Sequence, residues 1–134
     1  MELSILIPAY NEAERIRSTL ISYGEFFKGR DAEILVIVNG SNDRTESLIR
    51  EEFLPRFEQL RLVVIPEKVG KGGALIRGLI ECSGNKISFT DADGSTPPGE
   101  LLRLSELLQT PGIIIGSRWL QESVIGRKQP LCRR

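Results

Sequence analysis

Two aspartates lie one residue apart in Asp91-Ala92-Asp93-Gly94, directly after the apolar run Ile87-Ser88-Phe89-Thr90. The chain contains only two other aspartates, so this pair is a concentrated source of carboxylate oxygens. Carboxylates at the end of a strand can share one hard divalent cation, and such a cation binds the oxygens of a diphosphate well. The pair therefore predicts a site for one Mg²⁺ or Mn²⁺ ion, completed by phosphate oxygens of a ligand.

The same tetrapeptide is also compatible with a solvent-exposed turn, because Asp and Gly are common turn residues. A calcium loop is excluded by its register. Thr96 stands where such a loop needs Gly, and Leu102 stands where it needs a bidentate Glu. A site for two metal ions is not expected, since few other carboxylates lie nearby in the sequence.

The composition excludes several classes of function. The chain has 134 residues, which corresponds to one domain, and its 18 basic and 18 acidic residues balance, which argues against broad binding of DNA or RNA. It contains no histidine, which excludes His-based zinc sites, Ser-His triads and imidazole acid–base catalysis. Any general base must therefore be a carboxylate, or the reaction must need none.

The sequence shows no signature of a secreted or membrane-spanning protein. No run of about 18 apolar residues predicts a transmembrane helix, and no charged and then apolar leader is found. The two cysteines, Cys82 and Cys132, lack metal-ligand spacing. We therefore expect a reduced, cytosolic chain.

Short apolar runs alternate with amphipathic stretches along the chain. Helical spacing of apolar residues predicts helices within 16–27, 43–55, 74–82 and 98–108, the second with a capping-box-like start at Asp43 and Glu46. The apolar runs are mostly β-branched and predict buried parallel strands at Leu3–Ile7, Ile34–Val38, Leu62–Ile65, Ile87–Phe89 and Ile113–Ile115. Strands and helices in this alternation predict an open, mostly parallel α/β sheet with helices on both faces.

In such sheets, ligands bind beyond the carboxyl ends of the strands. Most polar residues that are candidates for chemistry follow the predicted strand ends, so we expect them along one edge of the sheet. The segments concerned are Pro8–Glu12, Asn39–Asp43, Glu67–Gly73, Asp91–Thr96 and Gly116–Arg118. Their clustering is stronger evidence for a ligand site than any single motif.

Each of these motifs also has a purely structural alternative. Gly70-Lys71-Gly72-Gly73 matches neither a Walker loop nor the dinucleotide fingerprint, so it is either a turn before a helix or a place where Lys71 meets a phosphate. Asn39-Gly40-Ser41 is typical of a turn, and Glu12 is compatible with a first-turn acid that complements a helix dipole. Tyr10 is compatible with rim packing, and Arg118 with a solvated surface position.

Taken in order, these segments resemble the family 2 glycosyltransferases, and most closely the dolichyl-phosphate mannose and glucose synthases. The resemblance covers essentially the whole chain and rests on Ile5–Glu12, Val38–Asp43, Gly70–Gly72, Asp91–Gly94 and Gly116–Arg118. It implies the GT-A fold, a Rossmann-like three-layer nucleotide-binding sandwich. It also implies an inverting, metal-dependent transfer of a hexose from a UDP- or GDP-linked sugar, with Mg²⁺ or Mn²⁺ as the cofactor.

The resemblance further implies roles for individual residues. Asp91 would approach the ribose or the sugar and, together with Asp93, would hold the metal. Asp93 and Arg118 would act in catalysis, with Arg118 on a phosphate of the donor or acceptor. Ile37 and Asn39 would flank the base. The whole implied donor site is Pro8, Tyr10, Glu12, Ile37, Asn39, Lys71, Asp91, Ala92, Asp93 and Arg118.

The chain departs from the family pattern in three places. Val38-Asn39 replaces the usual Asp pair, so Asn39 can accept one base N–H but carries no charge. Ser95 stands where the mannose synthases use a Gln near the metal, and Gly94-Ser95-Thr96-Pro97 is more similar to the glucose synthases. Family members usually continue further, so we expect residues 1–134 to form one nucleotide-sugar-binding domain in which 117–134 begins an incomplete acceptor-side segment.

A polyprenyl or dolichyl phosphate is the acceptor that best suits this chain, because its oxygen is already anionic and needs no general base. Basic residues at 127, 128, 133 and 134 are compatible with a lipid headgroup surface and with a solvated end. With such an acceptor, we expect a protein that works at the cytoplasmic face of a membrane.

Two other functions remain compatible with the sequence. A shortened glycosyltransferase-like domain could bind nucleotide without transfer and would then need a partner or a missing segment for activity. A phosphatase of the haloacid-dehalogenase type also carries Asp-x-Asp-Gly after a strand. Its motif usually ends the first strand, however, and acids later in its sequence complete the magnesium site, whereas no aspartate follows Asp93 here.

Overall fold

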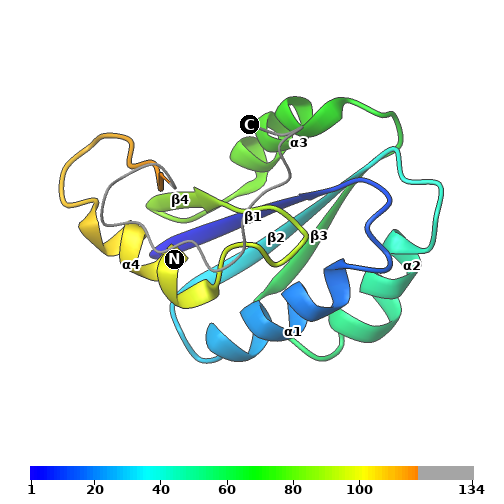
Figure 1. Ribbon diagram of the computed structural model, residues 1–134, viewed down its shortest axis with the longest axis horizontal. Coiled ribbons are helices and arrows are strands. Elements are labelled where there is room, and N and C mark those ends of the chain that lie inside the picture. Colours follow the sequence, from blue (N-terminus) through cyan, green and yellow to red (C-terminus); the bar gives the residue numbers. More distant parts are fainter. Residues whose placement is uncertain (118–134) are drawn as a thin grey trace.

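A parallel sheet forms the centre of the protein in the computed structural model, which describes residues 1–117. The sheet has the strand order β3-β2-β1-β4 (Figure 1), and all its pairings are parallel. Every residue of β1 and β2 is buried, as expected for strands covered on both faces. The strands are β1 (Leu3–Ala9), β2 (Ala32–Asn39), β3 (Leu60–Ile65) and β4 (Lys86–Phe89).

Helices cover both faces of the sheet (Figure 1), which confirms the predicted architecture. On one face α3 (Gly70–Glu81) packs across β1 and β2, with Ala74 next to Leu6, Leu35 and Ile37. The opposite face holds the larger hydrophobic core. The helices that cover this core are α1 (Ile16–Phe26), α2 (Thr45–Leu48) with its π-helical continuation η1 (Ile49–Phe53), and α4 (Pro98–Leu107).

A buried carboxylate, Glu33 of β2, joins several parts of the fold. Glu33 is 2% exposed and accepts hydrogen bonds from Ser4 Oγ (2.6 Å), Ser83 N (2.6 Å) and Arg61 Nη1 (2.6 Å). Burial by itself disfavours the ionised form, but these donors outweigh it and lower the pKa of Glu33 from 4.5 to about 2. The ionised carboxylate therefore links β1, β3 and the connection after α3 to the centre of the sheet.

The segment after α4 differs from the sequence prediction. Residues 113–115 form no strand in the structure, and Ile113 and Ile115 are 90% and 81% exposed. A β-branched run becomes a strand only where it pairs with a sheet edge, and this run does not pair with β4. The predicted strand Ile113–Ile115 is therefore wrong. The prediction that β4 is buried is also wrong, because β4 lies at the sheet edge and exposes Ile87 and Phe89.

The second predicted helix forms as α2 and η1, but without a capping box. Asp43 Oδ1 accepts a hydrogen bond from Thr45 N (2.9 Å), whereas Glu46 Oε1 accepts one from Arg50 Nε (2.8 Å) on the helix surface. Glu46 is thus drawn toward the next turn of the helix rather than back to its start. Within residues 1–117, no helix combines the length and the apolar composition needed to span a bilayer.

Candidate functional site

The ends of β1, β2 and β4 surround a cleft of about 470 Å³, and the start of α3 completes its wall. Four of the five segments that were predicted to converge supply residues to this cleft, whereas Gly116 and Ser117 of the fifth do not line it. The cleft also contains Ala9, Lys68 and Gly70, which lie in the predicted segments but were given no individual site role, and Arg15, which lies outside those segments. The predicted site residues that line it are Pro8, Tyr10, Glu12, Asn39, Lys71, Asp91, Ala92 and Asp93.

Among the described residues, one predicted site residue is not brought to this cleft. Ile37 is fully buried in β2, where it packs with Leu6 and Leu35 beneath α3, so its side chain does not line the cleft. Asn39 follows two residues later on the same face of β2, at the end of the strand, and does line it. Arg118 lies outside the described residues, so its predicted contact with phosphate stays a prediction.

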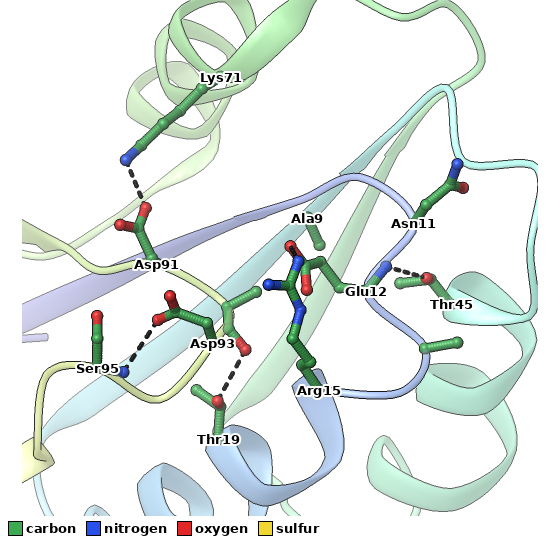
Figure 2. A network of polar contacts seen from close by, with 12 residues as sticks. Ala9, Asn11, Glu12, Arg15, Thr19, Thr45, Lys71, Asp91, Asp93 and Ser95 are labelled. Carbon is green, nitrogen blue, oxygen red and sulfur yellow. Dashed lines mark hydrogen bonds and ion pairs between the residues drawn. The ribbon is translucent and has the colours of Figure 1, made fainter. Parts of the chain in front are cut away.

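The loops after β1 and β2 are held together by side-chain hydrogen bonds. Asn11 adopts a positive φ of 51°, donates its backbone N–H to Ser41 Oγ (3.0 Å), and accepts from Asn42 N (2.9 Å) through Oδ1. Glu12 N donates to Thr45 Oγ1 (2.9 Å; Figure 2). The turn after β2 thus holds Asn11 through Ser41, and the first residue of α2, Thr45, holds Glu12 beside the cleft.

Helix α1 anchors the loop that carries the two aspartates. Thr19 Oγ1 donates to Ala92 O (2.8 Å), and Tyr23 Oη donates to Thr96 O (2.8 Å). Asp93 Oδ1 accepts a hydrogen bond from Ser95 N (3.0 Å) within the loop (Figure 2). Ala92 is buried whereas Asp91 and Asp93 are exposed, so the anchored loop presents both carboxylates to the cleft.

Both aspartates have neighbours that stabilise negative charge. Asp91 forms an ion pair with Lys71 Nζ at the start of α3 (Figure 2). At Asp93, burial disfavours ionisation, but hydrogen bonds from Ser95 and the positive charge of Arg15 lower the pKa of the carboxyl below its ordinary value. Asp93 is therefore ionised at neutral pH and can act as a cation ligand.

Among the described residues, two buried oxygens of the cleft lining have no hydrogen-bond donor: Asn39 Oδ1 and Glu12 Oε2. Asn39 is 2% exposed, and its Nδ2 donates to Ala9 O (3.2 Å), which orients the amide. A buried acceptor without a donor costs about 1–3 kcal/mol. An N–H group of a bound ligand would remove this cost, in agreement with the predicted contact between Asn39 and a nucleobase.

The residues of the cleft fit one Mg²⁺ or Mn²⁺ ion that shares phosphate oxygens with a ligand. Asp91 and Asp93 supply carboxylate oxygens, and residues 1–117 contain no group of three or more His, Cys, Asp or Glu that could hold a metal alone. Mg²⁺ is usually bound by one or two carboxylates together with water and substrate phosphates. The donor set therefore suits an ion that binds together with a phosphorylated ligand.

Sequence reasoning missed two basic residues of the cleft. Arg15 Nη2 pairs with Glu12 Oε1 (2.8 Å), and Lys68 Nζ lies 4.0 Å from the centre of the Tyr10 ring. The i, i+3 spacing of Glu12 and Arg15 is a local signal that could have found the first pair. The second pair has no local signal, because Tyr10 and Lys68 follow different strands.

A family model described as glycosyl transferase family 2 matches residues 4–131. The chain belongs to glycosyl transferase family 2. It is 34% identical over 133 residues to a dolichyl-phosphate beta-glucosyltransferase of Drosophila melanogaster, an alignment that covers 88% of this chain and 41% of the relative. It is 31% identical over 122 residues to a dolichol-phosphate mannosyltransferase of Pyrococcus furiosus, covering 90% of this chain and 34% of the relative. The chain thus spans about two fifths of the length of the curated relatives that it matches.

Solved structures share the fold of this family 2 chain. A mannosyltransferase from Pyrobaculum calidifontis in complex with GDP-Man and Mn²⁺ superposes with a TM-score of 0.73 at 31% identity, covering 82% of this chain and 33% of that chain. Glucosyl-3-phosphoglycerate synthase from Mycobacterium tuberculosis, in complex with Mn²⁺, UDP and glucosyl-3-phosphoglycerate, superposes with a TM-score of 0.66 at 30% identity, covering 84% and 41%. These similarities confirm the expected GT-A fold.

Proposed function

We propose that this chain provides the donor site of an inverting, metal-dependent hexosyltransferase that transfers sugar from a nucleotide-diphosphate donor to a polyprenyl or dolichyl phosphate. The observation that carries the proposal is the convergence of Tyr10, Asn39 and the Asp91/Asp93 pair on one cleft. Membership of the family supports sugar transfer, and the Mn²⁺ in two related structures supports a divalent cation. The names of the curated relatives support the acceptor. Such an acceptor would place the reaction at the cytoplasmic face of a membrane.

The cleft can bind the two ends of the donor by different chemistry. At the nucleoside end, Asn39 Oδ1 can accept a base N–H, and Tyr10, a residue that is 38% exposed, offers the apolar surface of its ring. At the diphosphate end, Asp91 and Asp93 would hold Mg²⁺ or Mn²⁺, which supplies Lewis-acid stabilisation to the departing diphosphate. Lys71 lies beside the Asp91 carboxylate and can pair with a phosphate oxygen.

The proposed reaction needs no proton transfer to a side chain. An acceptor phosphate oxygen forms a bond to the anomeric carbon from the face opposite the diphosphate. The bond from this carbon to the diphosphate oxygen breaks, its electron pair leaves with the nucleoside diphosphate, and the configuration inverts. The acceptor oxygen is already anionic, which suits a cleft whose acids Glu12, Asp91 and Asp93 are engaged by neighbouring donors. The task of the side chains is to bind the reactants and orient them.

Sugar transfer and its metal dependence test the proposal. Purified protein is incubated with Mn²⁺, a polyprenyl phosphate and either UDP-glucose or GDP-mannose, and labelled sugar is measured in the lipid phase. We expect transfer that a chelator abolishes and that Asp93→Ala reduces roughly a hundredfold, because a ligand of the ion is lost. Asp31→Ala is the matched control, because the Asp31 side chain is 70% exposed and Asp31 does not line the cleft.

Binding measurements separate the possible failures. Calorimetry with UDP and GDP, each with and without Mn²⁺, reports on the donor site independently of transfer. Metal-dependent nucleotide binding without transfer to any acceptor would contradict the enzymatic proposal and support a nucleotide-binding module. Nucleotide binding that keeps its metal dependence in Asp93→Ala would remove the metal role of that residue.

A further inference from the structure

An arginine that has no part in the proposal above lies within the candidate site. Arg15, just before the first residue of α1, lines the 470 Å³ cleft and also a neighbouring hollow of about 520 Å³. Its side chain is 63% exposed, so the guanidinium is accessible to a ligand. Figure 2 shows the guanidinium beside the Glu12 carboxylate, between Glu12 and the loop that carries Asp93.

Glu12 holds this guanidinium in place. The distance from Arg15 Nη2 to Glu12 Oε1 is 2.8 Å, and the Glu12 side chain is only 16% exposed. Glu12 is itself anchored, because its N–H donates to Thr45 Oγ1 and its carbonyl accepts from Ile16 N (2.8 Å). A guanidinium carries five N–H donors in a planar fork, and this bond uses one of them. The Arg15 side chain is thus preorganised, which reduces the entropic cost of binding a ligand. Its remaining N–H groups can donate to that ligand.

The charges around the cleft favour an anionic ligand next to Arg15. Three acids and three bases line the cleft, so its formal charges balance before any ligand binds. A divalent cation at the aspartate pair would add two positive charges, which a diphosphate would offset. Arg15 lines the same cleft as the aspartate pair, so its guanidinium can contact a ligand that is bound at the metal end. The charged residues are Glu12, Arg15, Lys68, Lys71, Asp91 and Asp93.

We infer that Arg15 binds the diphosphate of the donor as a second positive partner beside the metal ion, an inference that rests on the proposed function. A donor whose nucleoside lies at Tyr10 and Asn39 and whose metal ion lies at Asp93 would place its diphosphate between these two ends of the cleft. Arg15 lies in this region, between Glu12 and Asp93. A guanidinium binds phosphate oxygens in a bidentate geometry, which a lysine cannot reproduce. Arg15 therefore orients the diphosphate in addition to neutralising its charge.

The test compares ligands that contain and lack the diphosphate. In the presence of Mn²⁺, calorimetry measures the binding of UDP, uridine, GDP and guanosine to wild type, Arg15→Gln, Arg15→Lys and Arg17→Gln. Arg17→Gln is the matched control, because Arg17 lies two residues further along, in the first turn of α1, but pairs with Glu52 and does not line the cleft. We expect Arg15→Gln to weaken diphosphate binding roughly tenfold or more and nucleoside binding by less than about twofold. Arg15→Lys should show a smaller loss, again for the diphosphate alone.

Each other outcome has a distinct meaning. Equal losses for nucleoside and diphosphate would overturn the inference, because they would show that Arg15 only shapes the loop. An unchanged diphosphate affinity in Arg15→Gln would overturn it as well. If Arg15→Gln does not fold, judged by its melting curve, Arg15→Lys decides the question by the same comparison. Failure of the wild type to bind either UDP or GDP would contradict the proposed function itself, so the two failures are distinguishable.

Discussion

The ion pair between Lys71 and Asp91 should compete with metal binding, because the ammonium occupies one of the two carboxylates assigned to the ion. Replacing Lys71 by Met keeps an unbranched side chain and removes the charge. Without nucleotide, Lys71→Met should therefore bind Mn²⁺ more tightly than wild type. With Mn²⁺ present, the same variant should bind a nucleoside diphosphate more weakly, because a cation beside the phosphates is lost. The two affinities are thus expected to change in opposite directions.

The exposure of the pair sets the size of the first effect. The two side chains are 53% and 52% exposed, and ion pairs of this kind contribute about 0.2–1 kcal/mol. Because about 1.4 kcal/mol corresponds to a tenfold change, the affinity for Mn²⁺ should rise about 1.4- to 5-fold. The same solvent screening limits the loss of diphosphate affinity to about tenfold or less.

Two titrations measure these affinities. The EPR signal of free Mn²⁺ reports metal binding without nucleotide, and calorimetry with UDP or GDP reports diphosphate binding in Mn²⁺. Lys28→Met is the control, because Lys28 is exposed at the end of α1 and does not line the cleft. Weaker Mn²⁺ binding by Lys71→Met, or a change of both affinities in the same direction, would refute competition between the ammonium and the ion.

Two further predictions concern the framework that positions the site. Because the pKa of Glu33 is lowered from 4.5 to about 2, its contribution to the free energy of unfolding is present above pH 4.5 and is lost as the pH falls through about 2. Urea unfolding measures the free energy of unfolding at each pH. Between neutral pH and about pH 2, this free energy should fall by about 3 kcal/mol more in wild type than in Glu33→Gln, and equal decreases would contradict this role of Glu33. Gly40→Ala should destabilise by about 1–3 kcal/mol, because Gly40 has φ 60° and an added Cβ would lie 2.6 Å from Lys68 N. Gly29→Ala should destabilise the protein less, because Gly29 has φ 73° but an added Cβ there would have no atom within 4 Å. Equal melting temperatures for the two variants would show that the contact between the added Cβ at position 40 and Lys68 N has no effect on stability.

Local sequence patterns predicted most of the fold, because strands that are buried on both faces of the sheet have recognisable, continuous apolar sequences. The continuous apolar runs of β1 and β2 could be assigned as central strands, since only strands covered on both sides need such composition. The run at 113–115 has the same composition, yet it does not pair with the sheet. Composition records the preference for a strand, whereas pairing depends on an edge that the rest of the chain must bring within reach.

The sequence by itself determined which chemistry this chain can perform: without histidine, its candidate groups are carboxylates, amides, lysines and arginines, placed where strands end. Only the tertiary structure decided which of them share a cleft. Ile37 and Asn39 lie two residues apart, but one is buried under α3 and the other lines the cleft. Arg15 gains its candidate role because its ion pair with Glu12 holds the guanidinium at the cleft that Asp93 also lines. Which residues become neighbours at the edge of the sheet depends on the order of the strands and on where the helices pack. Long-range packing sets both, and no local sequence pattern contains that information.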